Sequence, residues 1–176
     1  RSSVHPARKY QNQSGPSPRD VARLLRGVIP PRLAEGAVWR FFDALAWNWL
    51  IAGTDGHAKN YSLLLAGSDV RLAPLYDIAS ALPYGTHERK LRFAMKIGGD
   101  YDVYSRRNGW GEAAGDLGVD PEAAVDRVLA LAQRTPDAFA EAATSPEVTA
   151  LERPLPTHLV DLVADRVARC VSVLYP

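Results

Sequence analysis

The first 16 residues show no regular spacing of apolar positions, and a helical spacing begins after them. Residues 1–16 are polar and carry Gly and Pro, so we expect an extended loop there. Ser17 is typical of an N-cap, and Pro18 is typical of a first helical position. We therefore predict a short helix that contains apolar Val21, Leu24 and Leu25 and ends near Gly27.

The strongest helical pattern covers about residues 32–52. Its apolar residues recur at helical spacing: Val38, Phe41, Phe42, Leu45, Trp49 and Leu50. Trp39 and Trp47 add bulk on other faces, so we expect this helix to be buried on most sides. We interpret its aromatic residues as core rather than as a base-stacking platform. Gly53 suits the C-terminal end of the helix.

Short β patterns follow the long helix. Residues 61–66 and 70–73 predict two paired strands joined by a turn at 67–69. This hairpin would bring the side chains of Asn60 and Asp77 back together. A further short strand is expected over 91–97, where Gly98 and Gly99 end it.

Helical patterns return in the last third of the chain. Asp120 and Pro121 open a helix to about Arg134, and we expect Thr135-Pro136 to break it before a segment at 137–144. We expect Thr157 to cap a last amphipathic helix that ends at Leu174. The fold class predicted from these patterns is mainly α with a small β-hairpin.

Composition fits one globular domain or one lobe of a larger protein, because 47% of the 176 residues are apolar. The net charge is +1, but the N-terminal segment is locally basic, with Arg1, Arg8, Lys9, Arg19, Arg23 and Arg26. Such a segment can hold phosphate or nucleic acid, although a solvated face is the favoured interpretation.

The cysteine count and the hydropathy of the chain indicate the kind of cellular compartment in which the protein is expected. Cys170 is the single cysteine, which excludes an internal disulfide and favours a reducing, cytoplasmic compartment. It lies in an apolar helical pattern, so we expect a buried structural thiol. No stretch of 18 apolar residues predicts a membrane span, and no signal-peptide pattern is present. Because the chain begins at Arg1 and its only methionine is Met95, we expect part of a longer translation product.

The candidate chemistry lies between the long helix and the hairpin. Asp55 and Asn60 have the spacing of the catalytic Asp and the metal-binding Asn in a protein kinase loop, and Asp77 follows as a further carboxylate. Asp55 is the candidate catalytic base, while Asn60 and Asp77 offer the oxygen ligands that Mg²⁺ prefers. Lys59 is a candidate to hold the transferring phosphate.

Each of these residues also has a structural interpretation. Asp55 could cap the turn after the long helix, Asn60 could tie down the loop, and Asp77 could cap a turn at 78–82. His57 is interpreted as a structural or substrate-orienting residue rather than a metal ligand, because the histidines lack zinc-type spacing. The chain also has no Gly-rich phosphate loop and no V-A-I-K-type lysine, so we identify no segment expected to cover a nucleotide.

Two runs, TDGHAKNYSLLL at 54–65 and RLAPLYDIASALP at 71–83, strongly resemble the C-terminal domain of HipA-like proteins. Lys9-Tyr10, Gly15-Pro16 and the run FAMKIGG at 93–99 extend this resemblance from about residue 4 to the last helix. HipA-like proteins are bacterial serine/threonine kinases, and many are toxins of toxin–antitoxin modules. The resemblance implies a kinase-like C-terminal lobe that forms a single domain over residues 1–176.

The resemblance also implies functional roles. Asp55 would be the catalytic base, Asn60 and Asp77 would bind Mg²⁺, and His57 and Lys59 would occupy the intervening motif positions, with Lys59 also a candidate to bind ATP. The family's N-terminal part, which completes the ATP site and carries a phosphate loop, is not in this chain. Residues 77–79 read Asp-Ile-Ala rather than D-F-G, which is normal for the family.

Partners and activity are further expectations from this resemblance. An aminoacyl-tRNA synthetase would be a candidate protein substrate, a helix-turn-helix antitoxin would be a partner, and DNA would be contacted through that partner. We expect residues 1–176 alone to be catalytically poor. The alternative is a non-catalytic binding module, either a pseudokinase or an antitoxin- or DNA-docking domain. A metal-dependent phosphohydrolase is disfavoured because it needs more clustered carboxylates.

Overall fold

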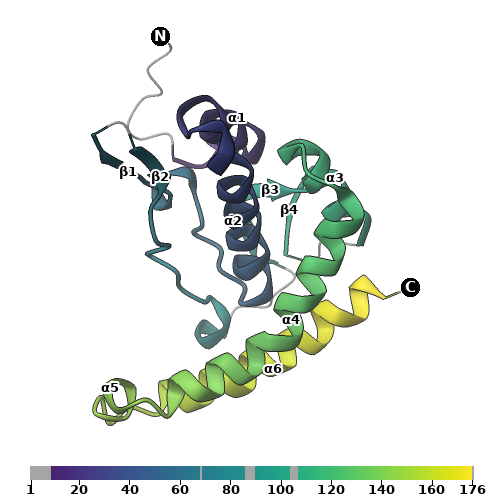
Figure 1. Ribbon diagram of the computed structural model, residues 1–176. Helices are drawn as coiled ribbons and strands as arrows, with labels where there is room; N and C mark the ends of the chain where they lie inside the picture. The colour runs from purple at the N-terminus through teal and green to yellow at the C-terminus, as the bar shows by residue number, and fades with distance from the viewer. Residues whose placement is uncertain (1–8, 68, 86–89, 104–106, 176) are drawn as a thin grey trace.

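The computed structural model describes residues 9–67, 69–85, 90–103 and 107–175, and Figure 1 shows their arrangement. The remaining positions, which include Arg1, Arg8 and Ser68 of the segments analysed above, lie outside the described residues. The helices are α1 (Pro18–Val28), α2 (Pro31–Leu50), α3 (Arg107–Leu117), α4 (Pro121–Ala143), α5 (Pro146–Thr149) and α6 (Leu155–Leu174). The strands are β1 (Leu63–Ala66), β2 (Asp69–Leu72), β3 (Arg92–Ile97) and β4 (Asp100–Asp102). The 3₁₀ turns are η1 (Gln11–Gln13), η2 (Ala58–Asn60) and η3 (Leu82–Tyr84).

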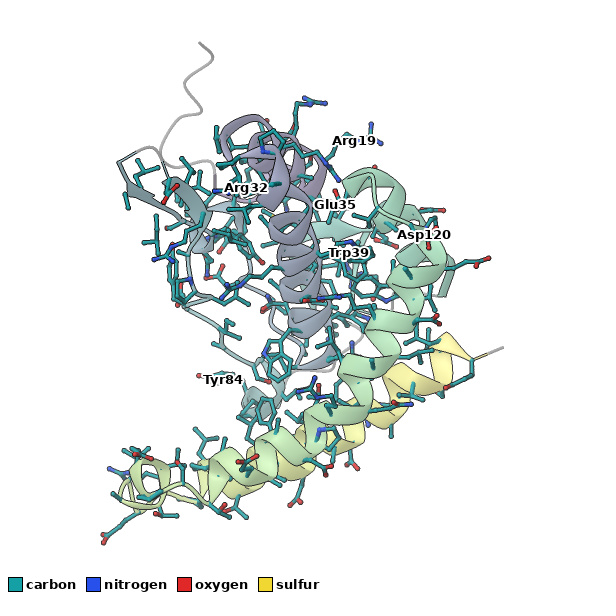
Figure 2. All side chains as sticks on the ribbon, in the orientation of Figure 1. Arg19, Arg32, Glu35, Trp39, Tyr84 and Asp120 are labelled. Carbon is teal, nitrogen blue, oxygen red and sulfur yellow. The ribbon has the colours of Figure 1, made fainter. Side chains whose placement is uncertain are left out.

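Helix α2 lies at the centre of the molecule and supplies much of its core (Figure 1). Trp49 is fully buried and packs edge-on against Trp110 of α3, with ring centroids 5.4 Å apart. Trp47 stacks on Phe139 of α4 at 5.8 Å, and the Arg127 guanidinium lies 5.3 Å from the ring centre of Trp39. Figure 2 shows Trp39 on the side of α2 that faces α4. The expected burial on most sides is confirmed for the second half of α2, from Phe41 to Leu50, whereas most residues of its first half are exposed.

Helix α1 begins as its sequence predicts. The Ser17 side chain accepts the backbone N–H of Asp20, and the Asp20 carboxylate accepts the backbone N–H of Ser17. This reciprocal pair satisfies two N–H groups that a helix start leaves without partners. The helix ends at Val28, one residue beyond the expected Gly27.

The last part of the chain forms two long helices that pack along each other, with the short α5 between them (Figure 1). The expected break at Thr135-Pro136 is wrong, because α4 runs through Pro136 to Ala143. Packing of α4 against α6 offsets the backbone hydrogen bond that Pro136 cannot donate. Helix α6 begins at Leu155, so the expected cap at Thr157 is also wrong. Cys170 is buried, as expected of a structural thiol.

Two small antiparallel hairpins complete the fold. β1 pairs with β2 in the register Leu63–Leu72 to Ala66–Asp69, which confirms the predicted hairpin. The first strand is shorter than predicted, and the second begins and ends one residue earlier. β3 confirms the strand expected over 91–97, but its partner β4 was not predicted because its three residues, Asp-Tyr-Asp, are too few to establish an alternating pattern. The mainly α fold class is confirmed, with one hairpin more than expected. Among the described helices, none combines the length and the apolar character that crossing a membrane requires.

Candidate active site

The loop that carries Asp55 begins where α2 ends, and its first residues approach the helix closely. Ile51 is the C-cap, and Ala52 adopts the left-handed conformation with φ of +53°. Gly53 was expected to end the helix, but Ala52 takes the left-handed position instead. Gly53 has a different role, because its backbone lies against the Asn48 side chain and an added Cβ would overlap Asn48 Oδ1. Gly53 is therefore a close-approach glycine.

Asn48 anchors this loop from inside α2. Its side chain is buried, and its Nδ2 donates to the carbonyl of Ala44 at 2.8 Å. Its own carbonyl accepts the N–H of Gly53 at 2.6 Å, and a Cβ on Gly56 would lie 3.1 Å from Nδ2. Sequence reasoning missed Asn48. The sequence does place Asn48 between two tryptophans in an otherwise apolar helix segment. A polar side chain at such a position is expected to be buried and therefore to need hydrogen-bond partners.

Tyr61 connects Asn48 to the end of the loop. Burial raises the pKa of the Tyr61 phenol well above its ordinary value, and a hydrogen bond with the Asn48 side chain acts in the opposite direction. The Tyr61 ring also packs edge-on against Phe41 of α2 at 4.8 Å. The segment after Asn60 is thus fixed to the core before β1 begins.

Asn60 and Asp77 lie together at the open end of the β1–β2 hairpin. Asn60 Nδ2 donates to Asp77 Oδ2 at 3.0 Å and to the Asp77 carbonyl at 3.2 Å. Tyr76 adds a second connection, because its hydroxyl donates to the carbonyl of Lys59 at 2.8 Å. The prediction that the hairpin reunites Asn60 and Asp77 is confirmed. The loop-tying interpretation of Asn60 also holds, since its amide nitrogen forms these bonds.

The backbone at Asp77 excludes its structural interpretation. Asp77 has a φ of +54°, and the next helical turn, η3, starts at Leu82 with Ala81 as its N-cap. Asp77 therefore does not cap a turn at 78–82. The left-handed region is costly for most residues, and Asp and Asn tolerate it better than others. This conformation leaves the Asp77 carboxylate exposed beside Asn60.

The arrangement fits a magnesium ion. Asn60 is only 5% exposed, and its Oδ1 is a buried oxygen without a hydrogen-bond partner among the described residues. The Asn60 amide contacts the Asp77 carboxylate through Nδ2, and an amide oxygen and a carboxylate are ligand types that Mg²⁺ takes. In the described part of the chain, no cluster of three or more His, Cys, Asp or Glu residues could hold a metal. Phosphate oxygens and water would have to complete the coordination of Mg²⁺.

Asp55 is exposed at the tip of the loop and is held by the N-terminal segment. The Tyr10 hydroxyl donates to Asp55 Oδ1 at 2.6 Å, and Lys9 Nζ lies 3.6 Å from Oδ2. Hydrogen bonding with Tyr10 and the nearby Asp55 charge raise the pKa of the Lys9 ammonium. Sequence reasoning did not place Lys9 or Tyr10 in the site, because they precede Asp55 by about 45 residues. The Asp55 carboxylate contacts this segment, whereas its alternative interpretation was a cap of the turn after the long helix.

His57 and Lys59 occupy opposite environments in the same loop. His57 is 6% exposed, its ring meets Tyr10 edge-on at 5.6 Å, and its Nε2 lies 3.9 Å from Asp55 Oδ1. Its Nδ1 has no hydrogen-bond partner within the described ranges. Lys59 is exposed on η2, directly before Asn60. The functional roles of both side chains stay predictions.

Comparison with known proteins places this geometry in a family. A model of the HipA-like C-terminal domain matches residues 2–139. The chain is 29% identical over 164 residues to a Sinorhizobium fredii protein named "Putative kinase Y4mE", covering 93% of the chain and 38% of that relative. HipA of Shewanella oneidensis, solved with HipB and its operator DNA, has a TM-score of 0.77 at 20% identity.

That match covers 97% of the chain and 42% of HipA, so the chain spans about two-fifths of the length of the proteins that it resembles. The resemblance seen in the motif and the matched fold agree with each other. The chain therefore belongs to the family of HipA-like C-terminal domains.

Proposed function

We propose that this chain is the part of a Mg²⁺-dependent protein kinase that supplies the catalytic base and the metal ligands. The reaction is transfer of the γ-phosphoryl group of ATP to a serine or threonine hydroxyl of a protein. The observation that carries this proposal is the buried Oδ1 of Asn60, which has no hydrogen-bond partner among the described residues and belongs to the side chain that contacts the Asp77 carboxylate. A buried polar atom without a partner is costly, so its retention favours a ligand such as a cation.

Each loop residue has a role in this proposal. Asn60 and Asp77 hold the ion, which neutralises charge on the phosphates of ATP as the γ-phosphoryl group is transferred. Asp55 accepts the proton of the attacking hydroxyl, and the exposed Lys59 offers its positive charge to the transferring phosphate. His57 packs beneath Asp55 and orients the loop. The rigid α2 and the Asn48 anchor keep this loop in place.

The proposal for the whole protein rests on its relatives. Since those proteins are more than twice as long as this chain, we assign the cover of the nucleotide to the rest of the protein. The S. oneidensis HipA structure contains HipB and operator DNA, which supports a helix-turn-helix antitoxin as partner, with DNA bound through it. An aminoacyl-tRNA synthetase as substrate and a cytoplasmic location complete the proposal.

The described basic residues do not favour the alternative of a DNA-docking module. Arg19 forms an ion pair with Asp116 of α3 at 2.6 Å. Figure 2 shows Arg19 beside α3. Arg23 pairs with Asp20, and Arg26 binds Glu35 and the carbonyls that end α3. Because acidic groups and carbonyls of the domain already engage these side chains, the basic segment is better explained as a face of the fold.

Phosphoryl transfer tests the proposal. The protein as encoded in its gene would be incubated with γ-labelled ATP and candidate protein acceptors, with Mg²⁺ and then with excess EDTA. We expect transfer only with Mg²⁺ and a loss of at least about 100-fold in the Asp55→Asn variant, a typical contribution of a catalytic base. Transfer that persists in EDTA or in Asp55→Asn would refute the assigned roles.

A further inference from the structure

The Lys9-Tyr10 segment contacts the candidate base from far away in the sequence. Tyr10 Oη lies 2.6 Å from Asp55 Oδ1, and the Lys9 ammonium lies 3.6 Å from Oδ2. Both carboxylate oxygens of Asp55 therefore face groups from one short segment at the N-terminal end of the described chain. The two groups differ in how firmly they are held.

The backbone of Tyr10 is fixed by hydrogen bonds within the turn that follows it. Its carbonyl accepts the N–H groups of Gln13 and Gly15 at 3.0 and 2.8 Å, which close the turn of η1. A Cβ on Gly15 would lie 2.6 Å from that carbonyl oxygen, so the turn requires glycine. The next residue, Gln11, accepts the backbone N–H of Lys96 in β3 at 2.7 Å, which connects the turn to the second hairpin.

The Tyr10 ring is held from the other side by the catalytic loop itself. His57 is buried and meets this ring edge-on at 5.6 Å. Tyr10 and His57 thus contact each other and both approach Asp55 Oδ1. Lys9 is held less firmly, because its ion pair is partly exposed and such pairs contribute little when water competes.

We infer that Tyr10 is a positioning residue for phosphoryl transfer: its hydroxyl fixes Asp55 through Oδ1 and leaves Oδ2 as the oxygen that accepts the substrate proton. A carboxylate has enough lone pairs to take both bonds. Lys9, the weaker partner, gives up its place at Oδ2 when the acceptor hydroxyl arrives. This inference rests on the proposed kinase function and adds a residue outside the catalytic loop to it.

The test compares Tyr10→Phe with a matched control, Tyr175→Phe, in the protein as encoded in its gene. Both changes remove one phenol oxygen, and Tyr175 is an exposed residue at the end of α6. We expect Tyr10→Phe to lower kcat at least about tenfold, because a poorly oriented base is a common cause of rate loss. The KM values for ATP and for the protein acceptor should stay within about twofold of those of the wild type, since no substrate contact is removed.

Amide hydrogen exchange of residues 54–60 gives a second readout that does not need turnover. We expect faster exchange of this loop in Tyr10→Phe and no change in Tyr175→Phe. Unchanged kcat and unchanged exchange in Tyr10→Phe would overturn the inference while leaving the kinase proposal standing. A rise in kcat/KM for the acceptor would also overturn it, because Tyr10 would then block the acceptor site. A wild-type protein without transfer activity would refute the proposed function itself and, with it, the role of Tyr10 in the reaction.

Discussion

Asn60 Nδ2 lies 3.0 Å from Asp77 Oδ2, although the two residues are 17 positions apart in the sequence. The β1–β2 hairpin makes this contact, because its antiparallel strands return the chain to its starting point. The contact fixes the orientation of the Asn60 amide, because Nδ2 is the atom that faces Asp77. With the nitrogen directed to Asp77, the oxygen remains buried and has no hydrogen-bond partner among the described residues.

Gly53→Ala should destabilise the protein. The added methyl would overlap the Asn48 side chain, which is buried and bonded to Ala44, so Asn48 would have to leave its hydrogen bonds. We expect the free energy of unfolding to fall by about 1–3 kcal/mol, as overpacked sites typically show. Chemical denaturation measures this change.

Gly36→Ala is the matched control, because it lies in α2 where an added Cβ meets no atom within 4 Å. It should raise the unfolding free energy by about 0.5–1 kcal/mol through helix propensity. Equal effects of the two substitutions would show that Asn48 does not constrain the loop.

Tyr61 should make stability depend on pH in the alkaline range. Its folded pKa is raised above the unfolded value of about 10. The contribution of the neutral phenol is therefore fully present below pH 10 and is lost as the pH rises through the raised value, because the unfolded state releases its proton first. Other groups titrate there too, so the quantity to measure is the difference between wild type and Tyr61→Phe.

We expect the unfolding free energy of the wild type to fall relative to Tyr61→Phe above pH 10, and to show no such trend between pH 7 and 9. Tyr84→Phe serves as the control, because Tyr84 is 81% exposed and projects from the surface in Figure 2. A constant difference across the whole range would show that the phenol is not buried.

Pro136→Ala should stabilise the protein. Helix α4 continues through Pro136, so the new N–H can bond the carbonyl four residues earlier and the ring no longer crowds it. We expect a gain of about 1–3 kcal/mol in unfolding free energy, part of the usual helix penalty of proline. Pro121→Ala should change little, because Pro121 stands at the first position of the same helix. A loss of stability in Pro136→Ala would mean that the ring contributes packing that outweighs the missing bond.

Much of the site could be predicted from the sequence because its residues lie in one loop and the hairpin that follows it. The spacing of Asp55 and Asn60 lies within one loop, and the hairpin that returns to Asp77 has a recognisable turn. The Ser17 cap of α1 is equally local, and its capping box is present. The loop spacing and the cap depend on residues within a few positions of one another, and the return to Asp77 depends on one short hairpin.

The parts that sequence reasoning missed depend on contacts between distant segments. Tyr10 reaches Asp55 across 45 positions, and no periodicity encodes that contact. The continuation of α4 through Pro136 depends on α6, which outweighs a strong local signal. Gly53 was assigned to the wrong role because the approach of Asn48 is visible only in three dimensions.

The most direct test of the account measures metal binding at Asn60 and Asp77. Mn²⁺ can replace Mg²⁺, and its electron paramagnetic resonance signal reports binding in the presence of ATP. Asp77→Asn is a suitable variant, because Asn also tolerates a φ of +54° and keeps an acceptor for Asn60. Unfolding curves of the variant should match those of the wild type, which would exclude a folding defect.

We predict that the wild-type protein and Asp55→Asn bind Mn²⁺ with ATP equally well. Asp77→Asn and Asn60→Ala should each lose at least about tenfold in affinity, since the first removes the negative charge of the carboxylate ligand and the second removes the amide ligand. Wild-type affinity for Mn²⁺ in both Asp77→Asn and Asn60→Ala would contradict the account, because the ion would then bind elsewhere.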